Sequence, residues 1–177
     1  KVLKKNNSIE VKVGPIESMS KSKKNTIDPE KIINNYGADA VRLFILSDSP
    51  PEKDVQWSDE GMEGSYKFLQ KLWTLHNMFI EKINLDEKLD KKSEHISKFT
   101  NLLISKINQN IENFRYNVII ANFYEMYNFL SKELKKPVDK DTLILNYSKI
   151  LILLSPFTPH FAAECFEILK KYKKDLI

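Results

Sequence analysis

Cysteine, glycine and arginine are scarce in this chain of 177 residues. Its one cysteine, Cys165, excludes a disulfide within the chain and a metal site built from several thiolates. Four glycines and seven prolines favour long helices over a turn-rich β protein. No apolar run approaches the ~20 residues needed to cross a bilayer, so we expect no membrane segment. These absences fit a cytoplasmic protein.

Charge of one sign is only slightly in excess, with 28 basic against 24 acidic residues and a net charge of +4. All of the basic residues are lysine except Arg42 and Arg115. A mild basic excess is compatible with nucleic-acid binding, but a lysine-rich composition alone also produces it. Charge therefore leaves both interpretations open.

The N-terminal third has short elements. Residues 8–13 alternate apolar and polar side chains, which predicts one half-buried strand. Asp28, followed by proline, predicts a helix start, and Gly37 predicts that this helix ends near residue 36. A second helix is expected over 38–47, with Val41, Phe44 and Ile45 on its apolar face. A proline-containing linker follows over 48–58.

From Asp59 the chain reads as amphipathic helices, expected over 59–83, 93–113, 117–135, 139–154 and 160–171. The apolar stripe of the first is Met62, Tyr66, Leu69, Trp73, His76 and Ile80. Short connections between such helices predict antiparallel neighbours. The fold class is therefore mainly α: an antiparallel helix bundle preceded by a short β/loop segment and two small helices. The predicted divisions are 1–27, 28–58 and 59–177.

A polar loop precedes the first helix, and residues 18–25 read S-M-S-K-S-K-K-N. Lys21, Lys23 and Lys24 lie within four residues of one another, beside Ser20 and Ser22. Flexible point charges next to small hydroxyl side chains and free backbone N–H groups are the chemistry that binds phosphate. The alternative from composition is a solvated surface loop.

The order of these residues resembles class I aminoacyl-tRNA synthetases, whose loop reads Lys-Met-Ser-Lys-Ser. Four of the five letters match, and Ser18 stands where the family usually has lysine. The match continues through Asn25, Asp28, Pro29, Tyr36, Gly37, Ala38, Asp39 and Arg42. The segment over 48–69 resembles the leucyl-tRNA synthetase version, and 114–121 and 155–164 resemble the family's bundle.

This resemblance implies a part of an enzyme that joins leucine to ATP, with Mg²⁺ accompanying the ATP, and then transfers leucine to tRNA(Leu). Lys21 maps onto the catalytic lysine that stabilises charge on the leaving pyrophosphate. The implied ATP-binding residues are Met19, Ser20, Lys21, Ser22 and Lys24, and no metal site of the chain's own is implied. Because Ser18 is too short to replace the missing lysine, either Lys23 or Lys24 contributes instead or the enzyme relies on Lys21 alone.

The bundle resembles the anticodon-binding domain of the class, which in the leucyl enzyme implies contact with the tRNA body. Outward lysines would hold its phosphates: Lys67, Lys71, Lys132, Lys135 and Lys136. The family's second ATP element, His-Ile-Gly-His, does not occur in this sequence. We therefore expect the chain to be a piece of a longer monomeric enzyme and to be inactive alone.

Two alternatives remain open. One is a piece of an isoleucyl, valyl or methionyl enzyme, and the other is a non-catalytic RNA-binding helical module. Other candidate side chains are assigned structural roles: His76 and His95 at the surface or in the core, His160 in packing or capping, Trp57 as an anchor of the linker, Trp73 in the core, and Arg115 in a buried ion pair.

Overall fold

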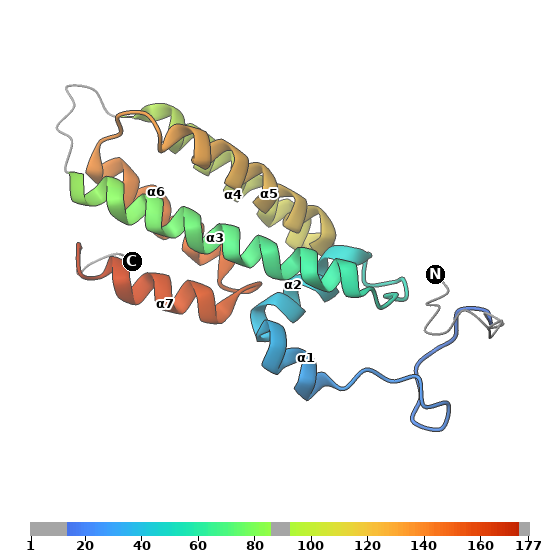
Figure 1. Ribbon diagram of the computed structural model, residues 1–177. Coiled ribbons are helices and arrows are strands. Elements are labelled where there is room, and N and C mark those ends of the chain that lie inside the picture. The colour runs from blue at the N-terminus through green and yellow to red at the C-terminus, as the bar shows by residue number, and fades with distance from the viewer. Residues whose placement is uncertain (1–13, 86–92, 174–177) are drawn as a thin grey trace.

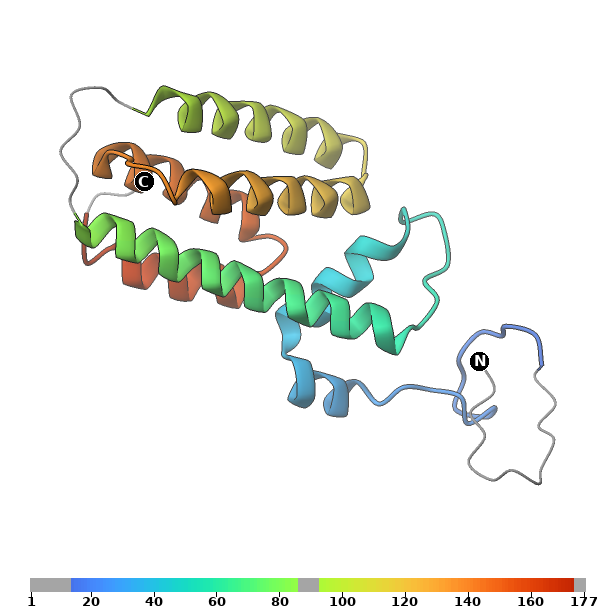
Figure 2. The same ribbon diagram turned by 45° about the horizontal axis from the view of Figure 1, so that its top comes forward.

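The computed structural model describes residues 14–85 and 93–173, and within these ranges the regular secondary structure is helical. The helices are α1 (Pro29–Tyr36), α2 (Ala38–Asp48), α3 (Asp59–Leu85), α4 (Glu94–Glu112), α5 (Tyr116–Glu133), α6 (Lys140–Leu154) and α7 (Pro159–Leu169). Helices α3 to α7 run alternately in opposite directions and form a bundle (Figures 1 and 2). The predicted fold class is confirmed. The strand expected over 8–13 lies outside the described residues.

The boundaries of the two small helices follow from local chemistry. The carboxylate of Asp28 accepts a hydrogen bond of 3.1 Å from the N–H of Glu30, and Pro29 occupies the first helical position. The N–H of Gly37 donates to the carbonyl of Ile33 over 2.8 Å and ends α1. With φ 81° and ψ 155°, Gly37 has a backbone conformation open only to glycine, and it sets the corner between α1 and α2.

The bundle core is continuous, but the faces of two helices differ from the predicted ones. On α3 the buried apolar residues are Met62, Phe68, Leu72, Leu75, Phe79 and Ile83. Trp73 was predicted in the core and is 40% exposed, so that prediction is wrong. On α2, Leu43 is buried, whereas Ile45, predicted on the apolar face, is 50% exposed. Both helices carry apolar residues beyond one narrow stripe, so periodicity alone placed the stripe about one residue away from the packed face.

Helix α2 connects two cores. Leu43 enters the main bundle core, while Ala40 and Phe44 pack with Met62 of α3 in a smaller cluster. Gly61 allows this close approach, because a Cβ atom there would lie 2.9 Å from the ring of Phe44. The helix therefore lies across one end of the bundle, in contact with α3, α5 and α7 (Figure 1).

A buried histidine lies within the bundle. His76 of α3 is 1% exposed, and its Nδ1 atom lies 2.6 Å from the hydroxyl of Tyr147 on α6. Its Nε2 atom is buried without a hydrogen-bond partner among the described residues. Burial lowers the pKa of His76 from 6.5 to about 4, since the charged ring would be desolvated. The core therefore holds this ring neutral.

The lowered pKa of His76 predicts that the fold loses stability in acid. Between pH 6.5 and 4 the unfolded chain binds a proton at this residue and the folded chain does not. The free energy of unfolding should therefore fall as the pH decreases through this range. His76→Gln should reduce that fall, as measured by urea unfolding at a series of pH values. Equal pH dependence of the two chains would show that His76 is not the cause.

Candidate functional site

The lysine loop, residues 17–25, is closed by its own backbone and side chains. The N–H groups of Lys23 and Lys24 each donate 3.2 Å bonds to carbonyls three residues earlier. Asn25 reaches back across the turn, where its Oδ1 accepts from the N–H of Ser20 over 2.8 Å and its Nδ2 donates to the carbonyl of Ser18 over 3.3 Å. The shape of the loop is thus encoded locally.

The cationic side chains of the loop differ in their partners. Lys23 forms a 2.8 Å ion pair with Glu17, both about half exposed. Lys21 and Lys24 have no such partner among the described residues, and both are exposed. Lys24 also has a positive φ of 53°, a conformation that is uncommon for a residue with a side chain. Two lysines of the loop are therefore available to an anion.

The remaining predicted site residues lie on the same turn. Ser20 is half-buried, and its hydroxyl lies 3.2 Å from that of Ser22. Met19 is 47% exposed and faces an open hollow shared with the linker residues Val55 and Trp57. The structure therefore brings Met19, Ser20, Lys21, Ser22 and Lys24 together on one exposed loop that projects away from the bundle (Figures 1 and 2).

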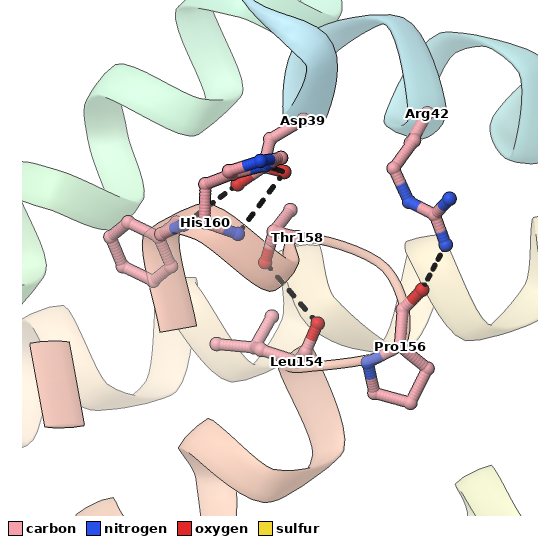
Figure 3. Close-up of polar contacts among 7 residues, drawn as sticks. Asp39, Arg42, Leu154, Pro156, Thr158 and His160 are labelled. Atoms are coloured by element: carbon pink, nitrogen blue, oxygen red, sulfur yellow. Dashed lines mark hydrogen bonds and ion pairs between the residues drawn. The ribbon is translucent and has the colours of Figure 1, made fainter. Parts of the chain in front are cut away.

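A second polar cluster joins α2 to the start of α7 (Figure 3). Asp39, in the first turn of α2, is 4% exposed. Its Oδ2 accepts a 2.7 Å bond from the N–H of Phe161, and its Oδ1 lies 3.4 Å from the N–H and 2.9 Å from the ring Nδ1 of His160. The carboxylate of one helix therefore caps another helix 121 residues along the chain.

Arg42, one turn after Asp39, reinforces this cluster. Its Nη2 donates to the carbonyl of Pro156 over 2.6 Å (Figure 3). Asp39 and Arg42 belong to the Y-G-A-D-x-x-R string, and Pro156 and His160 to the S-P-F-T-P-H string. Two strings far apart in the sequence thus meet at one junction.

The five bundle lysines predicted to face outward, Lys67, Lys71, Lys132, Lys135 and Lys136, are all exposed. Lys67 pairs with Glu63 and Lys136 with Glu133, each over 2.7 Å. Lys71 lies 5.9 Å above the ring of Tyr127, within the range of a cation–π contact. The Lys67–Glu63 pair is exposed and contributes little stability, so it does not prevent Lys67 from meeting a phosphate. Glu133 is buried and therefore holds Lys136 more firmly.

The other candidates have structural roles, with one correction. Trp57 packs edge-on against Phe44 and donates to Asp59 over 2.8 Å, which confirms it as an anchor of the linker. His95 is exposed and pairs with Glu133 over 2.7 Å. Arg115 was predicted in a buried ion pair, but it is exposed at the turn before α5, so this prediction is wrong.

The described part of the chain contains neither a membrane-crossing helix nor a metal-binding cluster. Over residues 14–85 and 93–173, no helix combines the length and apolar character of a membrane crossing. Within the same two ranges, histidine, cysteine, aspartate and glutamate side chains do not gather in threes in a way that could hold a metal ion.

Comparison with known proteins supplies the family. Residues 14–58 match the model of class I tRNA synthetases for I, L, M and V, and residues 93–177 match the anticodon-binding domain of tRNA ligases. A leucine–tRNA ligase of Orientia tsutsugamushi is 44% identical over 162 residues, and one of Bradyrhizobium diazoefficiens is 39% identical over 176 residues. The chain belongs to the class I tRNA synthetases, as a homologue of leucine–tRNA ligases.

These matches cover most of this chain but only a small part of each synthetase. Both ligases align with 90% of this chain, but the chain spans only 18–20% of their length. A solved structure, the ternary complex of Agrobacterium radiobacter K84 agnB2 LeuRS with tRNA and LeuAMS, shares the fold with a TM-score of 0.75. It is 24% identical, and the match covers 85% of this chain and 20% of that one.

The sequence alone predicts no role for Asp39 and Arg42, although both match the family motif. Their partners lie 114 to 122 residues away, so no local pattern could reveal them. One signal was present: an aspartate on the apolar side of a short helix is buried only when it has a partner. That signal indicates a contact without saying where the partner lies.

Asn25 gives a direct test of the closed loop. Asn25→Ala removes the amide that joins the backbones at residues 18 and 20, so the loop should open more often. We expect faster trypsin cleavage after Lys21, Lys23 and Lys24, followed by mass spectrometry. Asn34→Ala, which removes an exposed amide from α1, is the matched control. Equal cleavage of both variants would contradict the assigned role.

Proposed function

We propose that this chain is the lysine-loop and helix-bundle portion of a leucine–tRNA ligase, which activates leucine with ATP and transfers it to tRNA(Leu). The observation that carries the proposal is the Met19–Ser22 turn, exposed and cationic, ahead of a bundle whose relatives are leucine–tRNA ligases. The 90% alignment of this chain to those ligases favours the leucyl enzyme over the isoleucyl, valyl and methionyl ones.

In this proposal the loop binds the phosphates of ATP, with Mg²⁺ neutralising part of their charge. Lys21 stabilises the negative charge that develops on the departing pyrophosphate, while Met19, Ser20, Ser22 and Lys24 form the rest of the ATP contact. Lys24 has no ion-pair partner among the described residues, which supports its place in the ATP contact. The pair of Lys23 with Glu17 is exposed and weak, so Lys23 can also substitute for the lysine missing at position 18.

We further propose that residues 1–27 end the catalytic domain, 28–58 connect it to the bundle, and 59–177 form the tRNA-binding bundle. Exposed lysines on α3 and α5 support phosphate contacts to the tRNA body. The working enzyme would be a cytoplasmic monomer. The chain alone would not form leucyl-adenylate, since it carries only one of the two ATP elements.

Lys21→Ala tests the loop in the full-length polypeptide. Removing one charge aimed at the transition state should lower leucine-dependent ATP–pyrophosphate exchange by about 10²- to 10³-fold. Affinity for tRNA(Leu), measured by filter binding, should not change, because Lys21 lies in the turn before α1 and not on the bundle.

Lys31→Ala is the matched control, since Lys31 is an exposed lysine on the neighbouring helix α1. It should exchange pyrophosphate at the wild-type rate. The isolated 177-residue chain should show no exchange. Turnover by the isolated chain, or equal activity of the Lys21 variant and the wild type, would contradict the proposal.

The exposed lysines of the bundle predict that tRNA binding weakens as the salt concentration rises. If Lys132 and Lys135 neutralise phosphates, replacing both with alanine should weaken binding and reduce the slope of log K against log salt by about one per contact. Lys98→Ala, which removes a lysine paired with Glu94 on α4, should leave the slope unchanged. A binding constant that does not vary with salt would rule out phosphate contacts.

A further inference from the structure

We infer that Asp39 is a positioning residue that sets where the lysine loop stands relative to the bundle. This inference rests on the proposed function and adds a role for a side chain that touches neither ATP nor tRNA in that proposal. The supporting observations are the cap at α7, the burial of the carboxylate, and the path from α2 to the loop.

Helix α7 lacks a side-chain cap of its own. Thr158, at its N-cap position, forms no capping bond, and its hydroxyl lies 3.3 Å from the carbonyl of Leu154 behind it (Figure 3). Pro159, the first helical residue, has no N–H. The next two N–H groups, of His160 and Phe161, point to the carboxylate of Asp39. Asp39 thus supplies the acceptor that the start of α7 does not supply for itself.

The burial of Asp39 makes this contact obligatory. A carboxylate that is 4% exposed needs hydrogen-bond donors, because desolvating an unpaired charge is costly. Asp39 also lies in the first turn of α2, whose N-cap residue Gly37 has no side-chain cap. The positive ends of two helix dipoles therefore meet at one negative group. This geometry fixes α2 against α7 in one orientation.

The path from α2 to the loop runs through α1 and then through residues 26–28, which have no regular secondary structure. Gly37 joins α2 directly to α1, and the ring of Tyr36 on α1 packs edge-on against Tyr66 of α3 at 5.6 Å. The cap at Asp28 begins α1, and Asn25 of the loop lies three residues before it. No described hydrogen bond or ion pair joins residues 14–27 directly to the bundle. The position of the loop therefore depends on α1 and α2, together with the linker residues Val55 and Trp57, which share a hollow with Met19.

Asp39→Asn in the full-length polypeptide tests the inference. The amide keeps the size of the side chain but replaces one acceptor oxygen with a donor, which opposes the N–H groups of α7. The matched control is Asp139→Asn. Asp139 likewise closes two segments, accepting from the N–H of Thr142 over 2.9 Å and of Ser93 over 2.8 Å. Asp139 caps the N-terminal end of α6, whereas the junction of α2 with α7 follows the C-terminal end. The 15 residues of α6 span roughly 22 Å at 1.5 Å per residue.

The measurement is pyrophosphate exchange per competent site, with competent sites counted by the burst of adenylate formation. Asp39→Asn should lower kcat by about ten- to a hundredfold, the scale expected when a catalytic group is misplaced by about 1 Å. The KM for leucine and the affinity for tRNA should not change. Asp139→Asn should lose stability to a similar degree and keep the wild-type kcat per site.

Equal kcat values per competent site for the two variants would overturn the inference, because Asp39 would then act on stability alone. An absence of leucine-dependent exchange in the wild type would instead overturn the proposed function itself. If Asp39→Asn does not fold, Arg42→Ala serves as the second variant, since Arg42 is exposed and loses only its bond to Pro156. It should lower kcat in the same direction, and a wild-type kcat would overturn the inference.

Discussion

The carboxylate of Asp39 is the contact on which the arrangement of the molecule depends. It is buried, it lies at the start of one helix, and it accepts the first free N–H groups of another. An unsatisfied buried N–H costs about 1–3 kcal/mol, so α7 cannot leave this acceptor without a penalty. Arg42 adds a charged donor to the carbonyl of Pro156. The short N-terminal helices are thereby part of the same packed unit as the bundle.

Shape and placement of the lysine loop have separate physical origins. Its shape comes from bonds within residues 17–25, above all those of Asn25. Its placement comes from α1 and α2, which pack against the bundle through Leu43, Phe44 and Tyr36, and from the linker that shares a hollow with Met19. A loop formed by its own side chains loses less entropy when it meets a ligand, because part of the ordering is already complete.

Helix boundaries were predictable from the sequence because capping is local: Asp28, Pro29 and Gly37 act within one turn. Buried faces were less predictable, as Trp73 and Ile45 show, since periodicity does not say which of two apolar sides meets a neighbour. The residues of the lysine loop were predicted from the residue order of a short family motif. The junction of α2 with α7 could not be predicted, because a capping partner more than a hundred residues away leaves no periodic trace.

The separation of Asp39 from its partners has a consequence for biosynthesis. Because a ribosome releases the chain from its N-terminus, α2 emerges long before α7 exists. The carboxylate must remain hydrated until 122 further residues have been made, and only then can it exchange water for the N–H of Phe161. Pairing over so long a loop is slow to form, since closure entropy precedes any gain in contact energy. The contact between α2 and α7 should therefore be among the last to form in the nascent chain.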